Sequence, residues 1–595
     1  MTLPFSRRST AGAAPLPLIT AAASGRPWRL LPVDEEEAAA IAEAAKLPMP
    51  IARLLAARDV RAASASAYLE PSLRDELPDP FVLKDMDRAT ARLADAVMSG
   101  ETVGVFGDYD VDGTTGAALL KLYFDAIGAP LCAYLPDRIL EGYGPSIEAF
   151  RELARAGAKV IVTVDCGAAA HDVIEKAAAE GLDVIVFDHH LMAGAPPKGA
   201  VAVINPNQPG DISGLGGLSA VGVVFMALVA LNRALRGAGR FTDRAEPDLK
   251  GYLDLVALGL VCDVMPISGL TRTFVAQGLK VLGRGNKGLA ALGARAGLKG
   301  APSAYHLGFL LGPRINAAGR IGHARLAFEL LTSTDENRRV ALADQLHLLN
   351  AERQAVEAAV LDEALRAAER QTREVVVVAG EGWHQGVIGI VAGRLKEKLD
   401  RPAIVIALDG ETGKGSGRSI AGVDLGAAVI AAKQEGLLIA GGGHAMAAGL
   451  TIARGRIEGF SEFLNERLGR DVIVSRAARR VDIDAVVAAS AVTKEFADLI
   501  TRAGPFGAGN PEPVFVLTDM RAEFVRTVGD GHVSCTLVSR TGEQARAIAF
   551  RAAEMGLEPF LRAGEPLHIA GKIRPDDWRG GGAGQLHILD AAKAA

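Results

Sequence analysis

The stretch Val105-Phe106-Gly107-Asp108-Tyr109-Asp110-Val111-Asp112-Gly113 places three carboxylates on alternate positions directly after an apolar segment. Residues 102–106 have the continuous apolar character of a strand that is buried on both faces. In an open parallel sheet, ligands bind beyond the carboxyl ends of such strands. Three crowded carboxylates repel one another unless a cation or bound protons compensate. The stretch is therefore predicted either as a metal site made by Asp108, Asp110 and Asp112 or as a solvated Asp-Gly turn.

Three further apolar segments end in residues of types that bind metals. Residues 159–164 lead into Asp165, residues 183–187 lead into Asp188-His189-His190, and residues 255–261 lead into Cys262-Asp263. We interpret all of these segments as strands that deliver their polar residues to one edge of the same sheet. Carboxylates mixed with imidazoles suit Mn²⁺, Mg²⁺ or related ions, whereas a structural zinc site favours thiolates. This recurrence favours a metal centre over a solvated turn.

Length and composition limit what kind of protein this is. A chain of 595 residues is too long for one core, and 49% hydrophobic with 23% charged residues is typical of globular domains. With a net charge of −5, any contact with nucleic acid must come from local basic clusters. The four widely spaced cysteines fit a reducing cytosol, and no apolar run reaches the length of about 18 residues that a membrane span needs. We expect a cytoplasmic protein with no membrane association.

The sequence pattern predicts several domains. Residues 1–80 read as an N-terminal extension of short helices, the first 25 residues or so being disordered. In residues 81–334, apolar strands alternate with Ala-rich helices, which predicts a parallel sheet. Residues 335–374 contain no Pro or Gly and predict a long connecting helix, and residues 375–470 predict a second α/β lobe. From 471 to 595, short alternating segments separated by turns predict a small β-barrel.

Glycines and polar residues in the second lobe suggest a phosphate site. Residues 441–444 (Gly-Gly-Gly-His) are predicted as a turn whose backbone N–H groups, with the imidazole of His444, can approach a phosphate. Arg418 can form a bidentate pair with phosphate, and the Ser416 hydroxyl can donate a hydrogen bond. A glycine run alone would be an ordinary turn, but next to these side chains it predicts a phosphate cradle that includes Gly442 and Gly443.

Residues 107–113 together with Asp188-His189-His190 resemble the DHH phosphoesterase superfamily. Residues 312–320 (Gly-Pro-Arg-Ile-Asn-Ala-Ala-Gly-Arg), 382–389, 415–419 and 441–449 narrow the resemblance to the RecJ family, bacterial single-strand-specific 5′→3′ DNA exonucleases. The resemblance covers roughly residues 50–580. It implies a two-lobed fold of DHH and DHHA1 domains with an OB-like C-terminal barrel. It also implies phosphodiester hydrolysis with two divalent ions, Mn²⁺ or Mg²⁺, in DNA repair and recombination.

The resemblance also implies roles for single residues. The implied catalytic metal ligands are Asp110, Asp112, Asp165, His189, His190 and Asp263, with Asp165 as the bridge between two ions. Asp108 is either a further ligand or a carboxylate that orients one, and Asp188 either binds metal or holds a neighbouring histidine. Cys166 stands where the family often has Asn.

The substrate contacts are implied in the same way. Ser416, Arg418 and Arg138 would hold the 5′ end of the strand, and Tyr143 would stack on a base. Arg314 and Asn316 are placed in a loop that could close over the scissile phosphate, with an interlobe salt bridge as the alternative for Arg314.

Two other readings compete with the exonuclease. One is a different DHH phosphoesterase that acts on oligonucleotides or cyclic dinucleotides, which the extra residues after 471 disfavour. The other is a non-catalytic scaffold similar to Cdc45, which should have lost several metal ligands that are all present here. The expected partners are single-stranded DNA, a single-strand-binding protein and a RecQ-type helicase, and the expected state is a monomer.

Overall fold

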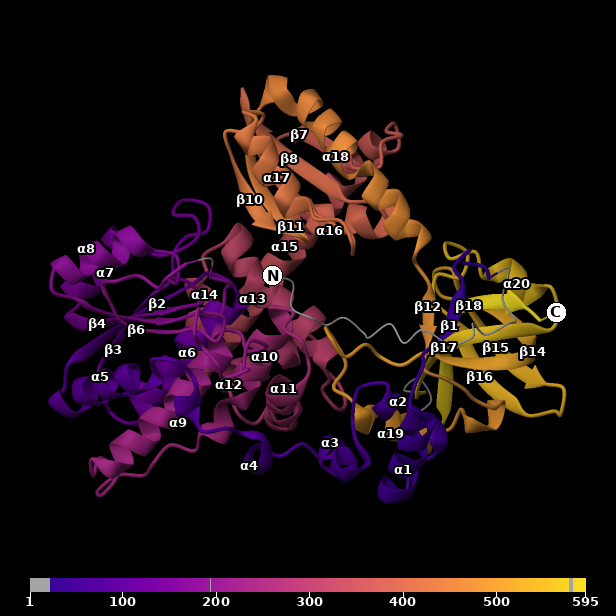
Figure 1. Ribbon diagram of the computed structural model, residues 1–595, viewed down its shortest axis with the longest axis horizontal. Helices are drawn as coiled ribbons and strands as arrows, with labels where there is room; N and C mark the ends of the chain where they lie inside the picture. The colour runs from indigo at the N-terminus through magenta and orange to yellow at the C-terminus, as the bar shows by residue number, and fades with distance from the viewer. Residues whose placement is uncertain (1–21, 193, 577–581, 595) are drawn as a thin grey trace. The chain divides into compact units, whose positions relative to one another are not determined.

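The computed structural model describes residues 22–192, 194–576 and 582–594. The chain divides into two compact units (Figure 1). The larger unit spans Glu76–Ala478, and the smaller unit combines the residues up to Asp75 with those from Arg479 onward. The larger unit contains a first lobe, a long helix and a second lobe.

A five-stranded parallel sheet forms the centre of the first lobe, as the alternation of strands and helices predicts. Phe106, Val162 and Val186 on its inner strands are completely buried, because helices cover both faces. The strand order is β3-β2-β4-β5-β6, with β2 (Thr102–Gly107), β3 (Leu131–Tyr134), β4 (Ala158–Val164), β5 (Asp183–Phe187) and β6 (Ala200–Ile204).

Two layers of helices cover this sheet. In Figure 1, α7 (Ile147–Arg155) and α8 (His171–Ala179) lie over one face, and α5 (Met86–Ser99), α6 (Val111–Ala126) and α9 (Ala220–Gly237) lie over the other. Among the described residues, α9 is the helix that is long and apolar enough to cross a membrane. Within the protein, 72% of that stretch is buried, so its apolar surface serves the packing of the lobe.

The segment 255–261 is not a strand, contrary to the sequence prediction. It lies in α10 (Leu253–Cys262), whose residues up to Leu260 are all buried against neighbouring helices. A helix that is apolar all round shows no 3.6-residue period, so a short apolar run does not distinguish it from a buried strand. The remaining elements of this lobe are η2 (Pro80–Val82), η3 (Leu249–Tyr252), α11 (Gly269–Val281), α12 (Lys287–Arg295), the π-helix η4 (His306–Leu311), α13 (Gly312–Ile321) and α14 (Arg325–Thr332). The short helix α4 (Leu73–Glu76) lies at the boundary between the two units.

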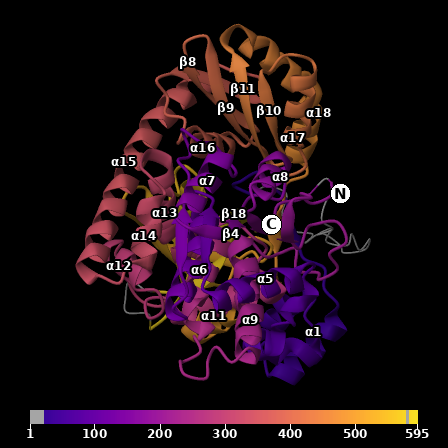
Figure 2. The same ribbon diagram turned by 90° about the vertical axis from the view of Figure 1, so that its left-hand side faces the viewer.

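The predicted connecting helix is α15 (Glu336–Ala368), which ends six residues before the expected boundary at 374. Its N-cap is Asp335, whose side chain accepts a hydrogen bond from the Arg338 backbone N–H at 3.1 Å. Figure 2 shows α15 running past α14 and α13 to α16 (Ile388–Leu399) of the second lobe.

The second lobe is the predicted α/β lobe, with strand order β10-β11-β9-β8-β7. Residues 441–444 form part of edge strand β10 (Ala440–His444), whereas the sequence predicted a turn there. The turn follows at residues 445–446. The other elements are β7 (Val376–Glu381), β8 (Ala403–Asp409), β9 (Thr412–Arg418), α17 (Leu425–Gln434), β11 (Ala447–Ala453), η5 (Arg454–Arg456) and α18 (Ile457–Ala477).

The smaller unit contains the predicted β-barrel. β14 pairs with both β15 and β17, and this closes a five-stranded barrel that is consistent with an OB fold. The strands are β14 (Phe515–Val528), β15 (His532–Ser539), β16 (Gln544–Ala549), β17 (Leu567–Pro575) and β18 (Gly584–Lys593), with β12 (Val481–Ile483), β13 (Ala485–Val486), η6 (Ala489–Ala491), α19 (Lys494–Ala503) and α20 (Glu558–Arg562) around them.

The N-terminal segment packs into this same unit. Ile51 and Leu54 share one hydrophobic core with Phe515 and Leu537 of the barrel. The elements of the segment are β1 (Trp28–Leu30), α1 (Glu35–Ala45), α2 (Met49–Ala56), η1 (Ala62–Ser64) and α3 (Ala65–Leu69). Disorder was expected over residues 1–25. Residues 1–21 lie outside the described part of the chain, but residues 22–25 are held in place, since the Ser24 backbone N–H donates to Asp590 at 3.0 Å.

Candidate metal centre

The polar residues at the strand ends meet at the carboxyl edge of the first-lobe sheet. Asp108 follows β2, Asp165 follows β4, and the Asp188-His189-His190 segment follows β5. Asp263 reaches the same place as the C-cap of α10. Gly113 is required here because a Cβ at that position would lie 2.5 Å from the backbone of Asp108, so α6 could not begin directly against the end of β2.

The side chains from these elements form three overlapping groups of potential metal ligands. The groups are Asp108-Asp110-Asp165, Asp165-His189-His190 and Asp112-His189-Asp263, each with its ligand atoms within 4.8 Å of one another. The His189 Nε2 atom lies 3.2 Å from an oxygen of Asp165 and 3.3 Å from an oxygen of Asp263. Because Asp165 belongs to two of the groups, it is placed where one carboxylate could touch two ions.

The donor set fits divalent cations. Within the described part of the chain, Asp108 Oδ1, Asp165 Oδ1 and His189 Nε2 are buried and make no hydrogen bond. Buried polar atoms normally have a partner, because leaving them unsatisfied costs about 1–3 kcal/mol each. Cations bound in the ligand groups that contain these atoms would satisfy all three. Carboxylate oxygens with imidazole nitrogens are ligands that Mn²⁺ accepts.

Two aspartates of the cluster also hold helix N-termini. The Asp110 carboxylate caps α6 by accepting hydrogen bonds from the backbone N–H groups of Asp112 and Gly113 at 2.9 and 3.1 Å. The Asp112 carboxylate accepts from the Ser219 hydroxyl at 2.7 Å and from the Ala220 N–H at 2.6 Å, at the start of α9. The start of each helix is thereby fixed to the candidate metal centre.

Hydrogen bonds orient both histidines. The Asp188 carboxylate lies 2.7 Å from His190 Nδ1, so Asp188 is placed to hold this imidazole. Burial alone would raise the pKa of Asp188, but hydrogen bonds, chiefly from His190, outweigh it and lower the pKa to about 2. The amide groups of Asn205 and Asn207 donate to the backbone carbonyls of His190 and His189 at 2.9 and 2.6 Å.

Charge crowding shifts the ionisation of the cluster. Burial, followed by repulsion from Asp110, raises the pKa of Asp112 to about 7 and raises that of Asp165 as well. Burial and repulsion from Asp112 raise the pKa of Asp263 to about 8. Burial and repulsion from His190 lower the pKa of His189 to about 4, which keeps this imidazole neutral and available as a ligand.

Cys166 takes no part in the cluster. Its side chain is completely buried in the hydrophobic core formed with Phe106 and Phe150. Burial raises the pKa of this thiol, so Cys166 is an unreactive packing residue.

Tyr143 contacts two of the candidate metal ligands. Its hydroxyl donates to the Asp165 backbone carbonyl at 3.1 Å and lies 3.3 Å from His190 Nδ1. The Tyr143 ring packs edge-on against the His190 ring, with the centroids 5.7 Å apart. These contacts place Tyr143 as a support for two candidate ligands.

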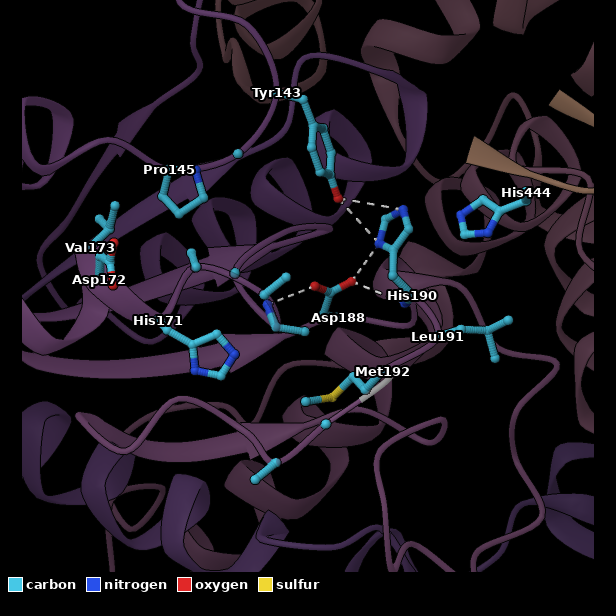
Figure 3. A pocket seen from close by; sticks show the side chains of 17 residues that line it. Tyr143, Pro145, His171, Asp172, Val173, Asp188, His190, Leu191, Met192 and His444 are labelled. Atoms are coloured by element: carbon cyan, nitrogen blue, oxygen red, sulfur yellow. Dashed lines mark hydrogen bonds and ion pairs between the residues drawn. The ribbon is translucent and has the colours of Figure 1, made fainter. Parts of the chain in front are cut away.

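A cavity of about 760 Å³ opens beside the cluster, with Tyr143, Asp188, His190 and His444 among its lining residues. Figure 3 shows the Tyr143 hydroxyl directed at His190 and the His444 ring on the same side of the cavity. The rest of its lining is mostly apolar and comes from residues 144–145, from residues 167–173 at the start of α8, and from Leu191, Met192, Gly194 and Ala195. A space of this size is typical of sites for small organic ligands, including a nucleotide.

Arg320 lies in a positive cluster with three other arginines of this unit. The Arg138 guanidinium lies 4.8 Å from the centroid of the Tyr109 ring. Burial and repulsion from Asp110 raise the pKa of Asp108, and the charge of Arg138 offsets part of that rise. Burial and repulsion from Arg138, Arg353 and Arg418 lower the pKa of Arg320 to about 10. The Arg320 guanidinium donates to the Gly386 carbonyl at 2.9 Å, which joins the first lobe to the second.

The predicted pair Ser416 and Arg418 lies on one face of β9. The Arg418 guanidinium donates to the Ser416 hydroxyl at 3.1 Å and to the Gly417 carbonyl at 2.8 Å. Gly389 leaves room for both side chains, because a Cβ there would lie 3.0 Å from Ser416 and 3.1 Å from Arg418. Gly443 adopts φ +153°, where a Cβ would lie 2.4 Å from the Ala447 carbonyl, so this position of β10 also requires glycine.

Arg314 and Asn316 lie on helix α13, not in a loop as predicted. The Arg314 guanidinium donates to the Leu310 carbonyl at 2.6 Å and to His347 of α15 at 3.3 Å. The two glycines and the proline of the 312–320 motif favoured a loop in the sequence prediction. The segment is a helix instead, and its apolar and small residues are buried. Closure over a phosphate by a loop is therefore not available to these two residues.

Sequence reasoning missed four polar residues that support the cluster. These are Asn205, Asn207, Ser219 and Arg320. Arg320 stands at the end of the 312–320 motif, so the motif contained the signal although Arg314 was chosen instead. The other three lie in connections after β6, where no regular spacing relates them to the aspartates they contact.

We expect the affinity of the metal-free protein for Mn²⁺ to fall as the pH is lowered from 8 to 6. Asp112 and Asp263 have pKa values raised to about 7 and 8, so both carboxyl groups hold protons in the metal-free protein below these pH values. The protonated forms stabilise the metal-free fold, and this contribution to the free energy of unfolding is lost as the pH rises through the two pKa values. Metal binding must displace these protons, so affinity should drop at least about tenfold over this range. Calorimetric titration with Mn²⁺ at pH 6, 7 and 8 measures this dependence.

Asp254 provides the matched control for this titration. Burial raises its pKa to about 6, but it accepts a hydrogen bond from the Asn286 N–H at 2.7 Å and belongs to none of the ligand groups. Asp254→Asn should leave the pH dependence of binding unchanged. An affinity for Mn²⁺ that does not vary between pH 6 and 8 would contradict the protonated cluster.

Comparison with known proteins accounts for most of the chain. The family model described as "DHH family, N-terminal domain" matches residues 102–260, the "DHHA1 domain" matches residues 372–470 and the "RecJ OB domain" matches residues 483–590. These ranges correspond to the first-lobe sheet with its helices, the second lobe and the barrel.

Curated relatives and a solved structure agree with this. The single-stranded-DNA-specific exonuclease RecJ of Bacillus subtilis (strain 168) is 33% identical over 96% of this chain and 71% of its own length. The protein of the same name from Escherichia coli (strain K12) is 37% identical over 82% of this chain and 86% of its own length. The crystal structure of RecJ in complex with Mn²⁺ from Thermus thermophilus superposes with a TM-score of 0.78 at 29% identity, covering 96% of this chain and 80% of that one. The chain belongs to the RecJ family of single-stranded-DNA-specific exonucleases.

Proposed function

We propose that this chain is a 5′→3′ exonuclease that hydrolyses single-stranded DNA with two divalent ions, Mn²⁺ or Mg²⁺, in DNA repair and recombination. The observation that carries the proposal is the cluster of buried and half-buried acids and histidines, in which three buried ligand atoms have no hydrogen bond. Arg138 and Arg320 interact electrostatically with Asp108 and Asp110 of this cluster, which supports a role for both arginines in phosphate binding. Family membership supports the substrate class, because the relatives are named single-stranded-DNA-specific exonucleases.

The residues that would hold the ions are those of the three ligand groups. In this proposal the ligands would be Asp110, Asp112, Asp165, His189, His190 and Asp263, with Asp165 shared between the two ions. Asp108 would be a further ligand or would orient one. Two ions held there would supply an activated water and neutralise charge at the phosphorus and the leaving oxygen. Asp188 and Tyr143 would keep the His190 ring in one orientation during turnover.

The arginine cluster would set the direction of digestion. Ser416 and Arg418 on β9 would bind the terminal 5′-phosphate, which lets the strand advance only until its end meets the second lobe. Arg138 and Arg320 would neutralise phosphates nearer the metal ligands, and His444 would donate to a nucleotide in the adjoining cavity. Because the 5′ end would be held at a fixed distance from the metal ions, cleavage would always occur close to that end, as in an exonuclease.

The barrel would bind the rest of the strand. On its surface the half-exposed Phe550 ring packs edge-on between His532 and His587, with each pair of centroids 5.2 Å apart. Aromatic rings on an OB-type barrel are typical stacking sites for bases. A different DHH phosphoesterase with small substrates would have no use for such a module, and a scaffold without catalysis would have no use for the intact ligand set.

Partners follow from the strand specificity. Because only an unwound strand can be digested, we propose that a RecQ-type helicase and a single-strand-binding protein deliver the substrate. We further propose that the protein acts in the cytoplasm as a monomer.

Digestion of a 5′-labelled and a 3′-labelled single strand tests the proposed activity. With Mn²⁺ or Mg²⁺, the 5′ label should be released first as a mononucleotide while the 3′-labelled strand shortens stepwise. Asp165→Asn should reduce the rate at least about a hundredfold with little change in fold, because the shared ligand would be lost. Release of the 3′ label first, or EDTA-resistant digestion, would refute the proposal.

Replacing Arg418 tests the role of the second lobe. Arg418→Ala should slow digestion of 5′-phosphorylated strands by roughly ten- to a hundredfold, because a hydrogen bond to a charged group contributes about 1.5–3 kcal/mol. The difference in digestion rate between 5′-phosphorylated and 5′-hydroxyl strands should also become smaller. Arg418→Lys should rescue only part of the loss, because an ammonium group makes no bidentate contact. Arg467→Ala on α18, an exposed arginine of the same lobe, serves as the control and should leave both rates unchanged. Equal losses on both kinds of end would assign Arg418 to general backbone binding.

A further inference from the structure

Two large aromatic side chains on the first lobe are exposed side by side. Tyr305 and Phe309 are 65% and 69% exposed, and their rings are stacked with the centroids 5.2 Å apart and the planes at 18°. We call this pair the aromatic step. Burying a Phe side chain normally stabilises a protein by about 1.5–3 kcal/mol, and exposed rings do not make this contribution. Two large exposed rings side by side therefore indicate a binding site for another molecule.

The aromatic step lies on an element clamped to the candidate metal centre. Phe309 belongs to the π-helix η4, whose opposite side buries Leu307 and Leu311. The Cys262 thiol contacts the Leu307 carbonyl at 3.6 Å, and a Cβ at Gly308 would lie 3.3 Å from a methyl of Val261. Cys262 directly precedes Asp263, so η4 is fixed to the end of α10 that carries a candidate ligand. π-Helical turns occur frequently at functional sites.

Positive charge borders the aromatic step. The Arg314 guanidinium donates to the carbonyl of Leu310, the residue next to Phe309, and to His347 on α15. Arg295 and Arg353 are close enough for their charges to lower the pKa of Arg314 further, after burial. Arg295 is paired with Asp344 and Arg353 with Glu357, so Arg314 is the positive group that these contacts place next to the rings. Stacked rings beside a guanidinium group are complementary to a polyanion with planar bases.

We propose that the aromatic step is a stacking platform on the catalytic lobe for the bases of the single strand whose end lies at the metals. The inference rests on the proposed exonuclease function and assigns substrate contacts to Tyr305 and Phe309, with Arg314 facing the backbone. The open face of a parallel stack accepts any base, so the contact is independent of sequence. It lies on the catalytic lobe itself and is separate from the barrel.

Kinetics and binding of the full chain test the proposal. Stacking of one base on an aromatic ring contributes about 1–3 kcal/mol to binding. Phe309→Ala should therefore raise KM for long oligothymidylates roughly tenfold and weaken their binding, measured in EDTA, by the same factor. The value of kcat should stay nearly unchanged. Phe309→Trp should restore both values, whereas Phe309→Leu should not, because an apolar side chain without a ring cannot stack. Tyr305→Ala should reproduce the effect of Phe309→Ala more weakly, since one ring remains.

Phe81→Ala is the matched control. Phe81 is a 41% exposed ring of the same unit with the Arg233 guanidinium 5.5 Å from its centroid, so it shares the chemistry but lies on η2. Its replacement should leave KM and binding unchanged. If Phe309→Ala digests and binds long strands like the wild type, or if Phe309→Leu performs as well as Phe309→Trp, the platform is excluded. Failure of the exonuclease proposal is distinguishable, because the wild-type protein would then show no digestion.

Discussion

Repulsion among buried carboxylates is the constraint on which the rest of the structure depends. Asp108, Asp112, Asp165 and Asp263 are brought together from strand and helix ends, and burial with mutual repulsion raises the pKa of each. Such a cluster is stable only when protons or cations compensate the charge. The surrounding features follow from this: helix N-termini face Asp110 and Asp112, asparagines fix the histidine backbone, and Arg138 adds positive charge.

The same electrostatic pattern extends from the cluster to the second lobe. Arg320 interacts with Asp110 on one side and donates to the Gly386 carbonyl on the other, so one side chain joins the ligand cluster to the lobe that carries Ser416 and Arg418. Gly389 and Gly443 keep space where larger residues would collide with Arg418 or with the neighbouring strand. The first lobe therefore carries both the acidic groups and the arginines Arg138 and Arg320, and the second lobe adds the positive charge of Arg418.

Much of this was predictable from the sequence because strand ends in a parallel sheet are marked by local patterns. The acidic and histidine segments after β2, β4 and β5 are contiguous in the chain, and they converge as predicted. What escaped prediction depends on tertiary contacts. The segment before Asp263 is a helix buried all round, residues 441–444 form an edge strand, and Ser219 reaches Asp112 across more than a hundred residues. The shared core of Leu54 and the barrel has no sequence signature at all.

The central claim is that the acidic cluster binds two ions joined by Asp165. Electron paramagnetic resonance of the protein loaded with Mn²⁺ tests it most directly. The account predicts that two equivalents bind and give the spectrum of a spin-coupled pair, and that Asp165→Asn abolishes the coupling. Binding of a single equivalent, or two equivalents with the six-line spectrum of isolated Mn²⁺, would contradict it.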